Sequence, residues 1–168
     1  SPIFRTAPVP MYLLSQRVAR EGIKVVLTGE GADEVAWGYD IFREAKIRRF
    51  WSRQPESKSR PLLFGKLYAY LPQFRDKRHL HLFVDFFKQE LRQTSSPLYS
   101  HQTRIANSRA AYLFLSTRLK EYIEKRSPTQ ALIDSLPSDF GRRTLLEKCQ
   151  YLEMRTLLQG YLLSSQGD

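Results

Sequence analysis

The sequence has little cysteine, no long apolar run and few acidic residues. One cysteine, Cys149, in 168 residues excludes an internal disulfide framework and a cysteine-based zinc site. No apolar run approaches the roughly 20 residues that span a bilayer, and no secretory signal pattern opens the chain. We therefore expect a reduced, cytoplasmic protein with no membrane partner, in which Cys149 is a core or surface thiol.

The overall composition is that of a globular protein with a strong basic excess. Hydrophobic residues make up 42% and aromatic residues 12%, which suits one ordinary domain with a packed core. The formal net charge is +10. A basic excess of this size indicates either an anionic partner or compensating acidic residues in a part of the protein outside this sequence. Because the chain does not begin with methionine, we expect a piece of a longer protein.

Half of that net charge lies in one segment, residues 41–60. It holds seven basic residues against two acidic ones, a net charge of +5. Phe42, Ile47, Phe50 and Trp51 suggest an amphipathic helix with its basic side turned to solvent. A basic helical module that binds nucleic acid or an acidic membrane is the other interpretation. No stacked-aromatic or zinc-finger pattern favours nucleic acid.

The spacing of apolar residues predicts a mostly α-helical chain. Proline and glycine punctuate the pattern and mark where helices start or stop. The expected helices cover about 8–22, 31–38, 40–51, 62–71, 79–92, 108–126 and 142–163. Polar or turn-rich stretches separate several of them, notably 52–61 and 127–141.

One short run, residues 24–27 (KVVL), predicts a buried strand of the parallel type. A single strand leaves unpaired N–H and C=O groups along both edges, so its partner strands must come from residues outside this chain. We therefore expect an internal fragment of a larger α/β domain. A self-sufficient helical bundle, with 24–27 buried as helix, is the other fold considered.

The residues after this run, 27–38 (LTGEGADEVAWG), form the most informative feature of the chain. Gly29 and Gly31 would let the main chain approach a ligand closely, at the turn where a strand gives way to a helix. Glu30 suits a general base, although a carboxylate there can also satisfy the N–H groups of the helix start. Asp33, one helical turn further, suits Mg²⁺, whereas Glu34 is expected either to be structural or to support the ligand-binding residues from behind.

These residues resemble the synthetase domain of the glutamine-dependent asparagine synthetase family. The resemblance is dense over residues 4–49 and is carried by three segments, 10–15 (PMYLLS), 22–34 (GIKVVLTGEGADE) and 38–39 (GY). It implies an α/β parent fold of the N-type ATP pyrophosphatase class, related to the adenine nucleotide alpha hydrolases. The chain, 1–168, would be a partial, mostly helical piece of that domain.

The resemblance also implies a reaction in two steps. ATP would adenylate the side-chain carboxylate of aspartate with release of pyrophosphate, and ammonia would then attack to give asparagine and AMP. The implied cofactors are ATP and Mg²⁺. The implied partners are aspartate, ammonia derived from glutamine, and the glutaminase domain of the same parent chain, while a homodimer stays open.

Carried across by position, the resemblance gives four site residues. Thr28 and Gly29 match the pair that contacts ATP, Glu30 matches the catalytic glutamate, and Asp33 matches the aspartate that helps to hold Mg²⁺ and pyrophosphate. The family usually has serine at the position of Thr28 and glycine at that of Trp37.

Two departures limit what these residues can do alone. The family's pyrophosphate loop, serine-glycine-glycine-x-aspartate-serine, is absent from the sequence, and so is the glutaminase domain. We therefore expect the 168 residues alone to be inactive. A family relative that amidates another carboxylic acid is a further interpretation.

Overall fold

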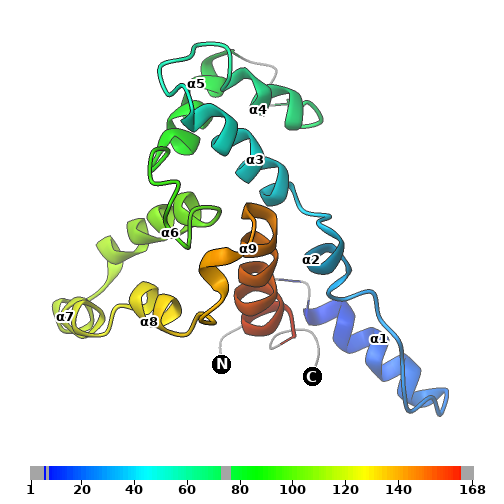
Figure 1. The fold of residues 1–168 in the computed structure, drawn as a ribbon. Helices are drawn as coiled ribbons and strands as arrows, with labels where there is room; N and C mark the ends of the chain where they lie inside the picture. Colours follow the sequence, from blue (N-terminus) through cyan, green and yellow to red (C-terminus); the bar gives the residue numbers. More distant parts are fainter. Residues whose placement is uncertain (1–5, 7, 73–76, 164–168) are drawn as a thin grey trace. The chain divides into compact units, whose positions relative to one another are not determined.

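The computed structural model describes residues 6, 8–72 and 77–163, and the side chains of 77–81 are left undescribed. Within these ranges the secondary structure is entirely helical (Figure 1). The α-helices are α1 (Pro8–Arg20), α2 (Ala32–Ala36), α3 (Asp40–Ser52), α4 (Leu62–Leu67), α5 (Lys77–Lys88), α6 (Gln102–Ser108), α7 (Thr117–Lys125), α8 (Pro128–Asp134) and α9 (Leu145–Leu152). The 3₁₀ helices are η2 (Arg109–Phe114) and η3 (Phe140–Arg142), and η4 (Glu153–Leu163) is a π-helix.

The predicted strand at 24–27 is wrong. Residues 23–29 have no regular structure, and no strand occurs in the described ranges with which they could pair. Val25 and Leu27 are 79% and 96% exposed, so the apolar run is not buried as helix either. A β-strand needs a neighbouring strand to hydrogen-bond its N–H and C=O groups. Without such a neighbour, an apolar run does not form a strand.

The chain divides into two compact units, which are described separately. The first comprises Ser1–Gly38 with Gln150–Asp168, and the second is Tyr39–Cys149. In the first unit α1 forms as expected, but none of its residues is buried, and Leu13 and Leu14 are 57% and 55% exposed. None of the helices in the described part of the chain has the length and apolar composition to cross a membrane.

An aromatic core holds the second unit together where α3, α4 and α5 meet. The rings of Phe64 and Phe87 stack with centroids 3.9 Å apart, and Trp51 meets Phe64 edge-on at 6.5 Å. Leu91 completes the buried cluster. Aromatic pairs in such geometries add to the free energy of burial, so this cluster fixes the three helices.

A smaller cluster places Cys149, which is fully buried, beside Ile41 and Phe42. Of the two positions expected for this thiol, core or surface, the core position is therefore confirmed.

Helix α3 does not turn all of its basic residues outward. Arg43, Lys46 and Arg49 are exposed, as expected, but Arg48 is only 1% exposed and shares the buried face with Glu44. The guanidinium donates three hydrogen bonds to main-chain carbonyls, so its charge is used inside the unit. The expected outward position is therefore wrong for Arg48.

The expected apolar face of α3 also differs at one position. Phe50 is 44% exposed, and the Arg60 guanidinium lies over its ring at 4.2 Å while donating a hydrogen bond to the Phe50 carbonyl. Arg60 is thus a second basic residue of the segment 41–60, after Arg48, whose charge interacts with other parts of the fold.

Glu44 is buried with its charge satisfied. Arg104 of α6 binds both of its carboxylate oxygens, at 2.6 and 3.1 Å, and the Tyr68 hydroxyl donates to it as well. Burial, followed by these interactions with Glu44, raises the pKa of the Tyr68 phenol well above its usual range. Tyr68 therefore remains a hydrogen-bond donor at physiological pH.

The helix predicted over 108–126 is broken in two. The 3₁₀ helix η2 ends at Phe114, Leu115 and Ser116 are extended, and α7 starts after Ser116, whose hydroxyl accepts from the Leu119 N–H. A serine whose hydroxyl accepts a hydrogen bond from the N–H three residues later is a helix N-cap. The segment that was predicted as one helix therefore contains the signal that starts a second helix. Helices α6 and α8 form where irregular structure was expected.

The last helix begins at Leu145 rather than at 142, because a capping box starts it. The Thr144 N–H donates to the Glu147 carboxylate at 2.7 Å, and the Glu147 N–H donates to the Thr144 hydroxyl at 3.4 Å. From Glu153 the helix widens to the π-form. The Thr156 hydroxyl donates to the Leu152 carbonyl at that junction, where it competes with the helical N–H.

Candidate functional site

The motif at 28–34 forms a loop followed by the short helix α2, in the first unit. Gly31 stands at the start of α2 with φ of +89°, a left-handed conformation that glycine adopts without steric cost. A Cβ at Gly31 would lie 3.4 Å from the Leu158 side chain of η4. Gly31 thus combines a required turn with close packing.

The end of α2 brings Gly38 back against Asp33. The Gly38 N–H donates to the Asp33 carbonyl at 2.8 Å, and Trp37 closes the helix with φ of +59°. A Cβ at Gly38 would collide with the Asp33 carboxylate and would lie 3.1 Å from the Asp33 Cα. The absence of a side chain at Gly38 therefore sets the position of the Asp33 carboxylate.

A contact from the C-terminal part of the unit fixes α2 further. The Gln150 side chain donates to the Val35 carbonyl at 2.7 Å, which ties α2 to the helix that continues into η4. Residues more than 100 positions apart thus hold the motif in place.

The three acids of the motif have different surroundings. Glu34 is fully buried, whereas Glu30 and Asp33 are exposed. The burial of Glu34 agrees with the structural role expected for it. Exposure leaves the Glu30 and Asp33 carboxylates open to a ligand, and Thr28 and Gly29 are exposed beside them.

The donor set suits a magnesium ion that is shared with phosphate. Among the described residues, no group of three or more His, Cys, Asp or Glu side chains is placed to hold a metal alone. Mg²⁺ does not need such a cage, because it commonly binds one or two carboxylates and takes its remaining ligands from phosphates and water. Asp33 as a single protein carboxylate fits that pattern.

Sequence reasoning missed one feature of the second unit. A cavity of about 270 Å³ brings together Arg49 of α3, the segment 94–100 and residues 143–148. The basic residues could be read from the sequence, but their convergence depends on contacts between segments nearly 100 residues apart.

Comparison with known proteins identifies relatives of the chain. A family model described as asparagine synthase matches residues 1–168. A putative glutamine-hydrolysing asparagine synthetase of Mycobacterium bovis is 41% identical over 81 residues, which are 48% of this chain and 12% of that protein. Asparagine synthetase B of Escherichia coli is 54% identical over 39 residues, 23% of this chain and 7% of that protein.

A third relative is matched over nearly all of the chain. Asparagine synthetase 1 of Bacillus subtilis is 25% identical over 165 residues, 96% of this chain and 23% of that protein. The chain thus spans less than a quarter of each of these three relatives. No solved structure matches the chain significantly.

Proposed function

Because the chain belongs to the asparagine synthase family, we propose that it is part of an ATP-dependent ligase that makes asparagine. The parent enzyme adenylates the side-chain carboxylate of aspartate, and ammonia derived from glutamine displaces AMP. The match over residues 1–168 carries this proposal. The names of the relatives favour asparagine over another amidated acid as the product.

Within this proposal, residues 1–168 are a partial synthetase domain, and the pyrophosphate loop and glutaminase domain belong to other parts of the parent. The exposed apolar residues of the first unit support this view. Val25, Leu27 and the apolar side chains of α1 are of the kind that a larger α/β domain would cover.

Each residue of the motif has a proposed role. The Gly29 main chain and the Thr28 hydroxyl contact ATP, where the lack of a side chain at Gly29 allows close approach. Asp33 helps to hold Mg²⁺, which neutralises the charge of the phosphates when it is bound. Glu30 acts as the general base that takes a proton from the attacking amine.

The geometry supports this division of roles. Gly38 holds the Asp33 carboxylate by leaving room for it, and Gly31 sets the turn that separates Glu30 from α2. Both carboxylates are exposed, so a ligand can reach them without a change in α2.

The proposal is tested with the full-length protein that contains this sequence. It is incubated with aspartate, ATP, Mg²⁺ and either glutamine or ammonia, and asparagine, AMP and pyrophosphate are measured. Formation of all three in equal amounts is expected. Consumption of ATP with a different acid but not with aspartate would overturn the product assignment, and no ATP cleavage with any acid would overturn the ligase.

A further inference from the structure

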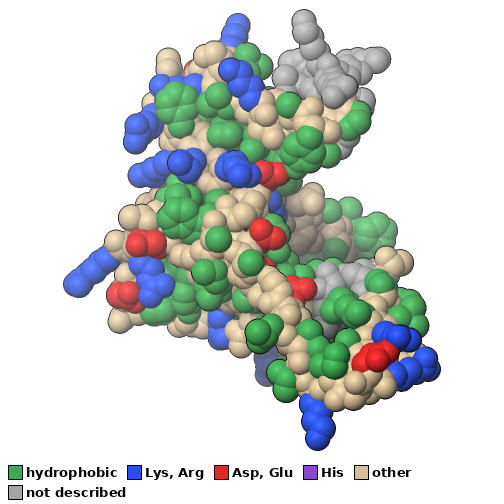
Figure 2. All heavy atoms as spheres, turned by 90° about the vertical axis from the view of Figure 1, so that its right-hand side faces the viewer, with side chains coloured by type: hydrophobic (Ala, Val, Ile, Leu, Met, Phe, Trp, Pro, Cys, Tyr) green, Lys and Arg blue, Asp and Glu red, His purple; other side chains and the backbone are tan. Residues whose placement is uncertain are grey.

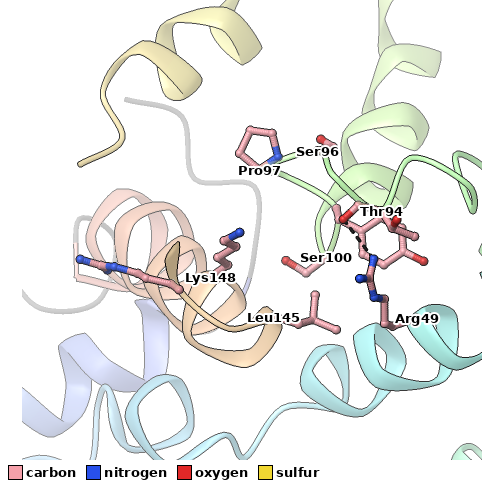
Figure 3. A pocket seen from close by; sticks show the side chains of 9 residues that line it. Arg49, Thr94, Ser96, Pro97, Ser100, Leu145 and Lys148 are labelled. Atoms are coloured by element: carbon pink, nitrogen blue, oxygen red, sulfur yellow. Dashed lines mark hydrogen bonds between the residues drawn. The ribbon is translucent and has the colours of Figure 1, made fainter. Parts of the chain in front are cut away.

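A concentration of cations surrounds a hollow in the second unit, and no residue of the motif at 28–34 lines it. Figure 3 shows Arg49 and Lys148 on opposite sides of the cavity, with Ser96 and Ser100 placed between them. Arg143 also lines the hollow, and none of the described acidic residues does. A hollow lined by cations and hydroxyl groups has the donors that an anion requires.

A second basic hollow adjoins the first. It has a volume of about 440 Å³ and shares Arg49 and Thr94 with its neighbour. Arg53 and Arg92 line it, and the described part of the chain again contributes no acidic side chain. Two adjoining basic hollows match a ligand that carries more than one anionic group.

Three of the five lining cations keep their charge available. Arg143 pairs with Asp139 at 3.1 Å and Arg92 pairs with Glu56 at 2.9 Å. In the described part of the chain, no carboxylate pairs with Arg49, Arg53 or Lys148. Arg49 and Lys148 instead donate to the main-chain carbonyls of Thr94 and Gly141. These bonds position the side chains without neutralising them.

The wall between the cations is rigid. Ser100 is 3% exposed and its hydroxyl hydrogen-bonds His101 Nδ1 at 2.9 Å. The preceding carbonyl, that of Tyr99, accepts from the buried Arg48 at 2.7 Å. Preorganised donors bind an anion more tightly, because little conformational entropy is lost on binding.

We propose that this pair of hollows binds a small ligand carrying phosphate groups, with Arg49 and Lys148 supplying charge and Ser96 supplying a hydroxyl donor. The proposal does not rest on the ligase function, since no residue of 28–34 lines either hollow.

The observations favour a small anion over a nucleic acid strand. Figure 2 shows Lys and Arg side chains scattered from the top to the bottom of the face in view, with no continuous stripe of them. Around the hollow they converge instead. Tyr99, its one aromatic lining residue, is 2% exposed and cannot stack on a base.

The test is a calorimetric titration of the full-length protein with pyrophosphate at low ionic strength. Because the parent would also carry its own pyrophosphate site, the readout is the part of the saturable binding that the hollow variants weaken. Arg49→Gln and Lys148→Gln should each weaken it about tenfold, the effect of losing one charge-assisted hydrogen bond. Lys46→Gln on α3 and Arg142→Gln at the end of η3 are the matched controls, because both side chains are exposed and line neither hollow. The controls should change the affinity less than twofold.

A parallel titration with ADP identifies the source of the phosphate. Tighter binding of ADP that is lost in Arg49→Gln points to a nucleotide, and equal or weaker binding points to free pyrophosphate. Circular dichroism checks that each variant is folded.

Two results would overturn the proposal. One is that the wild type binds no pyrophosphate, or that Arg49→Gln and Lys148→Gln leave its binding unchanged. The other is evidence for a diffuse basic surface. Such a surface would show itself as an equal loss of affinity in the control variants, or as tighter binding of a single-stranded oligonucleotide that all four variants reduce alike.

Discussion

Arg48 holds Tyr99 by two interactions at once: its Nη1 donates to the Tyr99 carbonyl at 2.7 Å, and its Cζ lies 4.6 Å from the centroid of the Tyr99 ring. Its remaining nitrogens donate to the carbonyls of Phe87 and Gln89, at 3.1 and 2.7 Å. Burial lowers the pKa of Arg48, partly offset by its neighbours. One side chain thus joins α3 to the end of α5 and to the segment that lines the cavity.

Arg48→Met should destabilise the protein strongly. The methionine retains apolar contact but leaves three main-chain carbonyls without their donor, at a cost of roughly 3 kcal/mol or more. Urea unfolding followed by circular dichroism measures the change. Lys46→Met, on the exposed side of the same helix, is the control and should stay within about 0.5 kcal/mol of wild type. Equal stability of the two variants would contradict the role given to Arg48.

Glu147 should make stability depend on pH. The hydrogen bonds from the Thr144 main chain, and then from its side chain, lower the pKa of the Glu147 carboxyl. A carboxyl whose pKa is lower in the folded state stabilises the fold above its ordinary pKa, and this stabilisation disappears as the pH falls through the folded value. Glu147→Ala should therefore lower the thermal midpoint at pH 7, and this effect should shrink as the pH falls from 7 to 3.

Thermal melts of Glu147→Ala over this pH range provide the measurement, with the exposed Glu121→Ala on α7 as the control. A difference between wild type and Glu147→Ala that stays constant from pH 7 to pH 3 would show that the carboxylate does not cap α9 in this way.

Gly38→Ala should disturb the candidate site by steric means. The new Cβ would collide with the Asp33 carboxylate, so either that side chain or the end of α2 must shift, at roughly 1 to 3 kcal/mol. Gly141→Ala is the control, because a Cβ there meets no atom within 4 Å. Thermal denaturation compares the two, and equal midpoints would contradict the packing of Asp33 on Gly38.

Asp33→Asn should raise the Mg²⁺ concentration needed for half-maximal activity of the full-length enzyme. The amide keeps the shape of the side chain but loses the charge that attracts the cation, and an effect of about tenfold is expected. The Mg²⁺ dependence of AMP formation is the measurement. An unchanged Mg²⁺ requirement would remove Asp33 from the metal site.

The sequence predicted most helices because their signals are local. Prolines, glycines and apolar spacing located α1, α3 and α4 to within a few residues. The start of α9 was misplaced although the Thr144–Glu147 capping box is visible in the sequence, as is the Ser116 cap that divides 108–126. These errors came from giving apolar periodicity more weight than helix-start signals.

Other features depend on contacts that no local pattern contains. Arg48 was predicted to face solvent because arginine usually does, and its burial depends on three carbonyls around 40 to 50 residues away. The predicted strand at 24–27 failed for the related reason that strand formation needs a distant partner. The motif at 28–34 could be predicted from residue types, whereas Gln150, which fixes α2, could not.

Asparagine formation by the full-length protein with Glu30→Gln tests the central claim most directly. Ammonia, aspartate, ATP and Mg²⁺ are supplied so that glutamine hydrolysis does not limit the rate, and Glu21→Gln, at an exposed turn residue just after α1, is the control. Loss of a general base at the motif should reduce product formation about 100-fold or more with an unchanged thermal midpoint. Turnover equal to wild type in a folded Glu30→Gln enzyme would contradict the claim that this carboxylate performs the chemistry.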